Sequence, residues 1–236
     1  MNTKRKSSSK ESKTNLMRWA GLSAAVSGLG FIVVGMFHQV NVPSSVTTAT
    51  WVNVHIVAIA MGFFGLFGMT GLYARQAEKA GWLGLAGFVL FSLWLGLIIP
   101  FSFVEAFILP QLATVLPGYV EGFLGTFTGI PSQIDLGILP ALWNISGPMF
   151  IVGPLLFGIA TFRAGILPRW AGGLLAVGSM LIPVAAFFPP ELEPKIMIPI
   201  GLALAWLGYA LFSERREQAS ELSPVGSARP ELSKAA

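Results

Sequence analysis

The sequence contains no cysteine and little charge. Without cysteine, the chain has no disulfide bond, no thiolate nucleophile and no metal or iron–sulfur site with thiolate ligands. Charged residues make up 11% of its 236 residues, whereas ordinary soluble domains have roughly 25%. Hydrophobic residues make up 54% and are gathered in long runs separated by short polar junctions. This pattern is typical of a protein that crosses a membrane several times.

The sequence also lacks the motifs of several enzyme classes. It has no phosphate-binding glycine loop, no HExxH zinc motif and no nucleophile elbow. Nucleic-acid binding is not indicated, because the basic residues behind the net charge of +4 lie at the ends of apolar runs and in the tails, where membrane topology explains them. The lipid bilayer is therefore the expected partner, and the sequence identifies no protein partner.

Six apolar segments have about the length that a helix needs to cross a bilayer, which is roughly 20 residues. Backbone groups in lipid must bond within their own segment, and no segment alternates with a period of two as a barrel strand does. We therefore predict an all-α fold, a bundle of six transmembrane helices. The first is expected to be retained, because it is long for a signal peptide and no small-x-small cleavage site follows it. The predicted spans are residues 19–37, 52–74, 82–105, 142–162, 170–188 and 196–212.

The distribution of lysine and arginine predicts the orientation of this bundle. Of the 15 basic residues, all except Lys195 fall on one side of the predicted spans. The positive-inside rule places that side, with both termini, in the cytoplasm. Residues 1–16 and 214–236 are polar and charged, which predicts disordered cytoplasmic tails on either side of a membrane domain of residues 17–213.

The segment between the third and fourth predicted spans, residues 106–140, stays apolar although it contains several prolines. Its central part is too short to cross a bilayer, and its large apolar residues fall on one helical face. We expect a re-entrant or interfacial helix that caps the outer end of the bundle. The residues of this face are Tyr119, Val120, Phe123, Leu124 and Phe127. Within the second span, glycines spaced by three predict close contact with another helix. They are Gly62, Gly65, Gly68 and Gly71.

Rare polar residues near the outer ends of the spans are the candidate functional residues. Glu105 follows Pro100 near the end of the third span, where a carboxylate is costly unless it is paired or hydrated at the headgroups. His38 ends the first span and His55 lies one turn inside the second, so the two rings can meet. With Glu105 they form a possible three-ligand site for zinc, iron or another divalent metal. The alternatives are ordinary hydrogen-bonded histidines, or a haem held by both rings.

Amides and tryptophans mark the outer starts of the second and fourth spans. Trp51 and Trp143 are predicted to be interface anchors. Asn144, if it faces the bundle interior beside Pro148, can bind a substrate where the proline leaves backbone carbonyls without donors. Asn53 occupies the matching place in the second span. The predicted substrate-binding residues are therefore Glu105, Asn144, His55 and Asn53.

Two stretches carry a resemblance to a group of known proteins. Residues 71–81, GLYARQAEKAG, and residues 103–110, FVEAFILP, resemble small uncharacterised polytopic membrane proteins of bacteria. The resemblance implies a bacterial cytoplasmic membrane location and no particular activity or cofactor.

Three functions remain open at this point. The leading hypothesis is a non-enzymatic membrane protein that binds or transports a small solute or ion through an outward-facing polar pocket. The first alternative is a redox or metal-binding protein that holds a metal, haem or quinone near His38 and His55. The second is a non-catalytic subunit of a membrane complex, in which the apolar outer segment contacts a partner.

Overall fold

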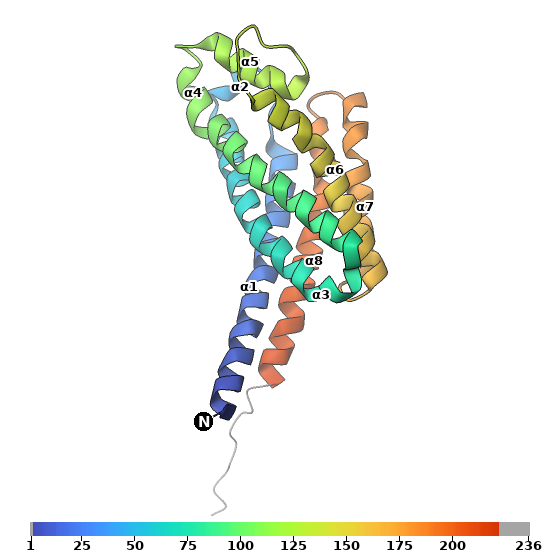
Figure 1. Cartoon of the computed structure of the whole chain (residues 1–236). Coiled ribbons are helices and arrows are strands. Elements are labelled where there is room, and N and C mark those ends of the chain that lie inside the picture. The colour runs from blue at the N-terminus through green and yellow to red at the C-terminus, as the bar shows by residue number, and fades with distance from the viewer. Residues whose placement is uncertain (1, 222–236) are drawn as a thin grey trace, which may run out of the picture.

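The computed structural model describes residues 2–221 as a bundle of helices, with no strand in that part of the chain (Figure 1). The prediction of an all-α fold is therefore confirmed. In the described part of the chain, four helical segments are long and apolar enough to cross a membrane, as expected of a membrane protein. They are Asn15–Phe37, Ala49–Leu112, Leu139–Ala164 and Glu193–Glu214.

The helix α3, Ala49–Phe103, is a hairpin rather than one straight helix (Figure 1). Gly81 has φ 56° and ψ −156°, a conformation that residues with a side chain rarely adopt. On either side of this elbow the two arms lie together, and Tyr73 stacks on Phe88 with ring centroids 4.8 Å apart. The second and third predicted spans thus correspond to the two arms of α3.

The other helices that run along the bundle are α1 (Asn2–Phe37), α6 (Leu139–Ala164), α7 (Arg169–Met180) and α8 (Ile198–Glu221). The helix α7 is shorter than the predicted fifth span, and a 3₁₀ segment, η2 (Ile182–Phe187), follows it. Proline at the second position of η2 has no N–H and clashes with the preceding turn, which ends the α-helix. A second 3₁₀ segment, η3, covers Glu193–Met197 just before α8.

The helices α1 and α8 extend past the predicted membrane domain. Residues 2–16, predicted to be disordered, continue α1 as helix, and residues 214–221 continue α8. Once an apolar segment has nucleated a helix, each further residue adds a hydrogen bond at little cost. Residues 222–236, the rest of the predicted C-terminal tail, lie outside the described part of the chain.

The glycines of the second predicted span allow close helix contact, as predicted. A Cβ atom added at Gly68 would lie 2.5 Å from the backbone of Ala24 in α1. The same is true on the other side of α1, where a Cβ at Gly28 would lie 2.5 Å from the carbonyl oxygen of Gly201 in α8. Backbones that approach so closely need small residues at the contact, so α1 lies tightly between α3 and α8.

Two buried clusters hold the bundle together. The central cluster contains stacked aromatic rings from three helices, and Trp94 lies 3.9 Å from Phe150 between ring centroids. The outer cluster lies beneath a short helix, α5 (Pro117–Thr128), which covers one end of the bundle (Figure 1). The predicted capping helix is therefore present, with its predicted face packed inward. The buried residues of the outer cluster are Val46, Trp51, Phe101, Leu109, Val120, Phe123 and Leu124.

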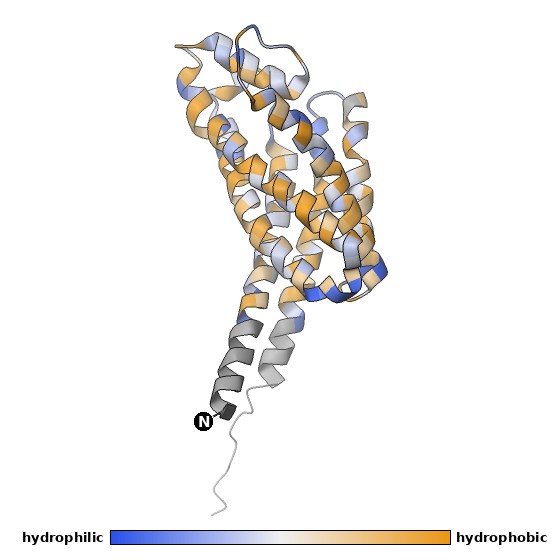
Figure 2. Ribbon diagram, viewed as in Figure 1, coloured by the Kyte–Doolittle hydropathy of each residue, from blue (hydrophilic) through white to orange (hydrophobic). Residues whose placement is uncertain are grey.

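The outside of the bundle is apolar along most of its length. Figure 2 shows hydrophobic residues over the helices and hydrophilic residues at the elbow of α3 and in the loops at the opposite end. Large side chains such as Phe67 and Val177 expose 69% and 61% of their surface. Soluble monomers rarely expose continuous apolar surface of this extent, so this surface suits contact with lipid.

Candidate functional site

The candidate site is a buried pair of titratable side chains at the capped end of the bundle. His55 comes from the first arm of α3, and Glu105 follows the second arm, in a π-helical turn called η1 (Val104–Ile108). His55 exposes 2% of its surface and Glu105 exposes 5%. The His55 Nε2 and Glu105 Oε2 atoms are 3.3 Å apart. Glu105 is thus buried against a partner and not hydrated at headgroup level.

The contacts of His55 show where its proton lies. Its Nδ1 atom is 2.8 Å from the backbone carbonyl oxygen of Trp51. A carbonyl oxygen can only accept a hydrogen bond, so Nδ1 carries a proton. The other nitrogen, Nε2, has no hydrogen bond with good geometry in the described residues and lies beside the Glu105 carboxyl group. A single proton placed between Nε2 and the Glu105 carboxyl group would give both atoms a hydrogen-bond partner.

The π-helical turn explains how Glu105 is held. In η1 the N–H of Leu109 donates to the Val104 carbonyl, one residue further back than in an α-helix. Pro110 has no N–H to donate, so the Glu105 carbonyl is left without a donor from its own helix. The indole Nε1–H of Trp51 supplies the missing hydrogen bond, at 2.9 Å. Turns of this kind are frequent at functional sites.

Trp51 therefore joins the two halves of the pair. It is fully buried, with an exposed fraction of 0%, so the prediction that it anchors in the membrane interface is wrong. Its side chain donates to the backbone of Glu105 and its backbone accepts from the ring of His55. Its ring lies 4.3 Å from the His55 ring between centroids. The sequence contained one usable signal, because Trp51 and His55 are four residues apart and share a helix face.

His38 completes the group from the end of α1. Its ring meets the His55 ring edge to face, with centroids 5.0 Å apart, and lies 5.7 Å from the Trp51 ring. Burial, with a smaller contribution from the neighbouring His55, lowers the pKa of His38 below its ordinary value. His38 is partly buried, so it lies between the enclosed pair and the surface.

His38, His55 and Glu105 lie together, but their side chains are not in the arrangement of a bound metal or haem site. Among the side chains that the structure describes, which lie within residues 15–214, no group of three or more histidine, aspartate or glutamate residues is arranged to hold a metal ion. A haem bound by His38 and His55 needs both rings to point at its iron from opposite faces, and an edge-to-face contact leaves no space for it. Metal binding by His38, His55 and Glu105 therefore stays a prediction.

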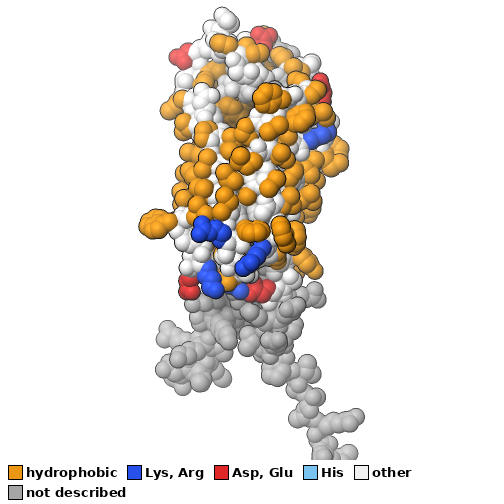
Figure 3. All heavy atoms as spheres, turned by 90° about the vertical axis from the view of Figure 1, so that its right-hand side faces the viewer, with side chains coloured by type: hydrophobic (Ala, Val, Ile, Leu, Met, Phe, Trp, Pro, Cys, Tyr) orange, Lys and Arg blue, Asp and Glu red, His pale blue; other side chains and the backbone are white. Residues whose placement is uncertain are grey.

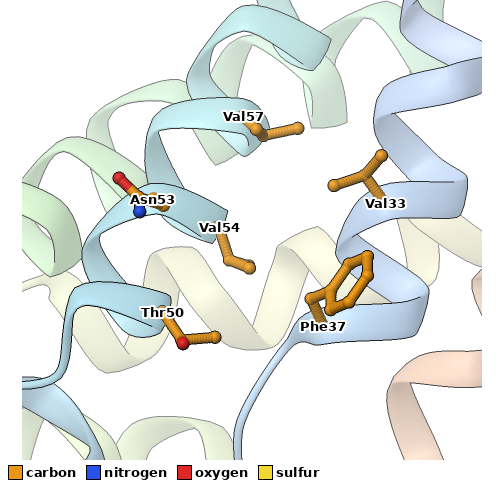
Figure 4. A pocket seen from close by; sticks show the side chains of 6 residues that line it. All are labelled: Val33, Phe37, Thr50, Asn53, Val54 and Val57. Atoms are coloured by element: carbon orange, nitrogen blue, oxygen red, sulfur yellow. The ribbon is translucent and has the colours of Figure 1, made fainter.

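The two candidate amides lie away from this group. Asn144 is exposed at the start of α6 and does not face the bundle interior. Asn53 is exposed at the edge of a shallow groove between α1 and α3. In Figure 4 the apolar side chains of this groove face one another, and the Asn53 amide lies away from them. The groove is lined by Val33, Phe37, Thr50, Asn53, Val54 and Val57.

A second buried polar contact lies at the opposite end of α3. The Gln76 side-chain Nε2 donates to the Thr161 hydroxyl at 2.8 Å, and both residues are buried. The central aromatic cluster, which includes Phe31, Phe91 and Trp94, separates this contact from the His55–Glu105 pair along the bundle. The two polar contacts are therefore separate.

No protein-family model, curated protein or solved structure matches this chain. The resemblance to small bacterial membrane proteins therefore stays a prediction. The functional interpretation rests on the geometry of the His55–Glu105 pair and its neighbours.

Proposed function

We propose that this chain crosses the bacterial cytoplasmic membrane six times, with both termini in the cytoplasm, and takes up a proton from the outer side at the buried His55–Glu105 pair. One observation carries the proposal. Two titratable side chains are enclosed 3.3 Å apart, and the hydrogen bond from His55 Nδ1 leaves a single position between them for a proton. Ionisable groups buried in membrane proteins commonly mark ion or proton sites.

The two arms of α3 support the count of six, because each arm is long and apolar enough to serve as a separate span. The helix α7 with η2 supplies the fifth. Arg75, Lys79, Arg163 and Arg169 belong to the elbow of α3 and the loop between α6 and α7, and Figure 3 shows basic side chains gathered at one end of the bundle. The positive-inside rule assigns this end to the cytoplasm.

A proton fits this site better than a larger solute does. The pair is enclosed by its neighbours, and the two amides expected to line a solute pocket lie outside it. The aromatic cluster around Phe31 and Trp94 fills the bundle between the pair and the cytoplasmic end. We therefore propose uptake and release on the outer side through His38, and not a proton path across the membrane.

The orientation is tested by chemical labelling, because a protein without cysteine accepts single reporters. Lys195→Cys should react with a membrane-impermeant maleimide on intact cells. Lys79→Cys should react only after the membrane is permeabilised. Labelling of Lys79→Cys on intact cells would overturn the orientation without affecting the chemistry of the pair.

The proton site is tested by NMR of protein that carries ¹⁵N-labelled histidine in nanodiscs. The chain has two histidines, so His38→Gln assigns both signals. We expect His55 to be doubly protonated or to be the neutral Nδ1–H tautomer at every pH, and Glu105→Gln to remove the doubly protonated form near neutral pH. A neutral His55 with its proton on Nε2, or a His55 signal that Glu105→Gln does not change, would reject the proposal.

A divalent metal is a second candidate ligand, favoured by two observations. Zinc bonds of about 2.0–2.2 Å to nitrogen and oxygen put two tetrahedral ligand atoms about 3.3 Å apart, which matches the His55–Glu105 contact. In addition, the Nδ1–H bond to a carbonyl is the arrangement that usually orients a zinc-bound histidine. His38 would have to turn to become the third ligand. Elemental analysis of protein purified without chelator separates the proton from the metal as the ligand. One equivalent of zinc in the wild type that is lost in His55→Ala would support the metal.

A further inference from the structure

The hairpin formed by α6 and α7 has an uncompensated positive charge. Arg163 lies in the last turn of α6 and Arg169 begins α7, and both are exposed. The sequence contains no acidic residue between Asp135 and Glu191. Neither arginine takes part in an ion pair within the described part of the chain, where the pairs are His55–Glu105 and Arg75–Glu214. This loop therefore differs from the other basic connection at the same end.

The elbow of α3 has its charge balanced. The Arg75 Nε atom lies 3.1 Å from both carboxylate oxygens of Glu214 at the end of α8. Lys79 follows Glu78 directly. A negatively charged ligand therefore gains less electrostatic binding free energy at the elbow than at the loop between α6 and α7.

The loop fixes the position of Arg169. Gly165 ends α6 with φ 62°, and its N–H donates to the Thr161 carbonyl. The Nε atom of Arg169 lies 2.7 Å from the place that a Cβ of Gly165 would occupy. The Arg169 side chain is therefore folded back over the end of α6, the helix end that also carries Arg163.

Exposed aromatic side chains adjoin the two arginines. Trp170 exposes 73% of its surface and packs edge to face against Phe162, with ring centroids 5.6 Å apart. Tryptophan at this level is typical of the boundary between lipid tails and headgroups. In Figure 3, which faces this side of the bundle, apolar surface continues directly above the basic side chains. A phosphate beside the arginines would have its acyl chains along this apolar surface.

We propose that the loop between α6 and α7 binds the headgroup phosphate of an anionic phospholipid through Arg163 and Arg169. Guanidinium groups pair with phosphate through two parallel hydrogen bonds, which a diffuse attraction to the membrane surface does not require. The choice of leaflet rests on the six-span orientation proposed above, whereas the preference for anionic lipid does not.

The test is native mass spectrometry of protein exchanged into mixed micelles of phosphatidylglycerol and phosphatidylcholine. We expect the wild type to retain phosphatidylglycerol preferentially, and Arg163→Gln/Arg169→Gln to lose the preference by about thirtyfold for two basic residues near the membrane surface. The control Arg75→Gln/Lys79→Gln removes the same charge from the same end and should keep most of the preference. Glycerol phosphate without acyl chains should not compete.

Three results would overturn the inference: equal losses in both double variants, which indicate diffuse electrostatics; no preference in the wild type; or full competition by glycerol phosphate, which indicates a soluble phosphate ligand. The histidine spectrum of each variant is a fold control, because the His55–Glu105 pair lies at the other end of the bundle. A failure here with a normal His55 spectrum leaves the proposed proton site intact.

Discussion

Replacing Trp51 by phenylalanine should lower the free energy of unfolding by more than the lost packing of the indole ring explains. The Glu105 carbonyl has no donor from its own helix and depends on the Trp51 indole. A buried acceptor left without a partner costs about 1–3 kcal/mol. Trp94 is the matched control, since it is almost equally buried but its indole N–H makes no hydrogen bond within the described residues. Both substitutions replace an indole ring by a phenyl ring, so they remove the same atoms from the core.

We therefore expect Trp51→Phe to lower the free energy of unfolding by about 1–3 kcal/mol more than Trp94→Phe. Reversible unfolding in mixed micelles with increasing SDS, followed by circular dichroism, measures both values. The histidine NMR spectrum gives a second readout, because Trp51→Phe should move the His55 signals and Trp94→Phe should not. Equal losses of stability, with unchanged His55 signals in both variants, would refute the role assigned to Trp51.

Three further predictions follow from other contacts. Glu105→Leu should lower the free energy of unfolding by about 3–5 kcal/mol because it leaves His55 without its partner, and His55→Phe/Glu105→Leu should recover much of that loss. SDS titration measures the stability of both variants. A double variant that is no more stable than Glu105→Leu would contradict this reasoning. Gly68→Ala should lower the free energy of unfolding by about 1–3 kcal/mol, because the added methyl group clashes with α1. Gly96 has open space around it, so Gly96→Ala should not destabilise the protein. Thermal unfolding compares the two variants. Because the pKa of His38 is lowered in the folded protein, the unfolded chain binds a proton more readily than the folded protein does below about pH 6.5. The free energy of unfolding should therefore fall as the pH drops from 7 to 5. The fall should be smaller in His38→Gln.

The general fold could be predicted from the sequence because apolar length and small-residue spacing are local properties. The contact of Gly68 with α1 and the packed face of α5 follow directly from helical periodicity. The shortening of α7 was also readable, because Pro183, three residues after Met180, ends the helix.

The candidate site was predictable only in part. Matching depth along neighbouring helices was enough to suggest that His38, His55 and Glu105 meet. The role of Trp51 was not predictable, because it depends on the π-helical turn that leaves the Glu105 carbonyl without a donor. The position of Asn144 depends on the rotation of α6 about its own axis, which packing against other helices sets and local sequence does not.

The elbow at Gly81 connects the two arms of α3 and lies far from both side chains of the His55–Glu105 pair. His55 lies about 26 residues from the elbow along its arm, which at 1.5 Å per residue is about 39 Å. Glu105 closes the other arm near the opposite tip. With a lever of that length, moving the tips 1 Å apart takes a rotation of only about 1.5° at the elbow. A small change of the bend at Gly81 would therefore be enough to change the distance between the two side chains, unless the packing of the arms and the hydrogen bond from Trp51 to Glu105 resist it.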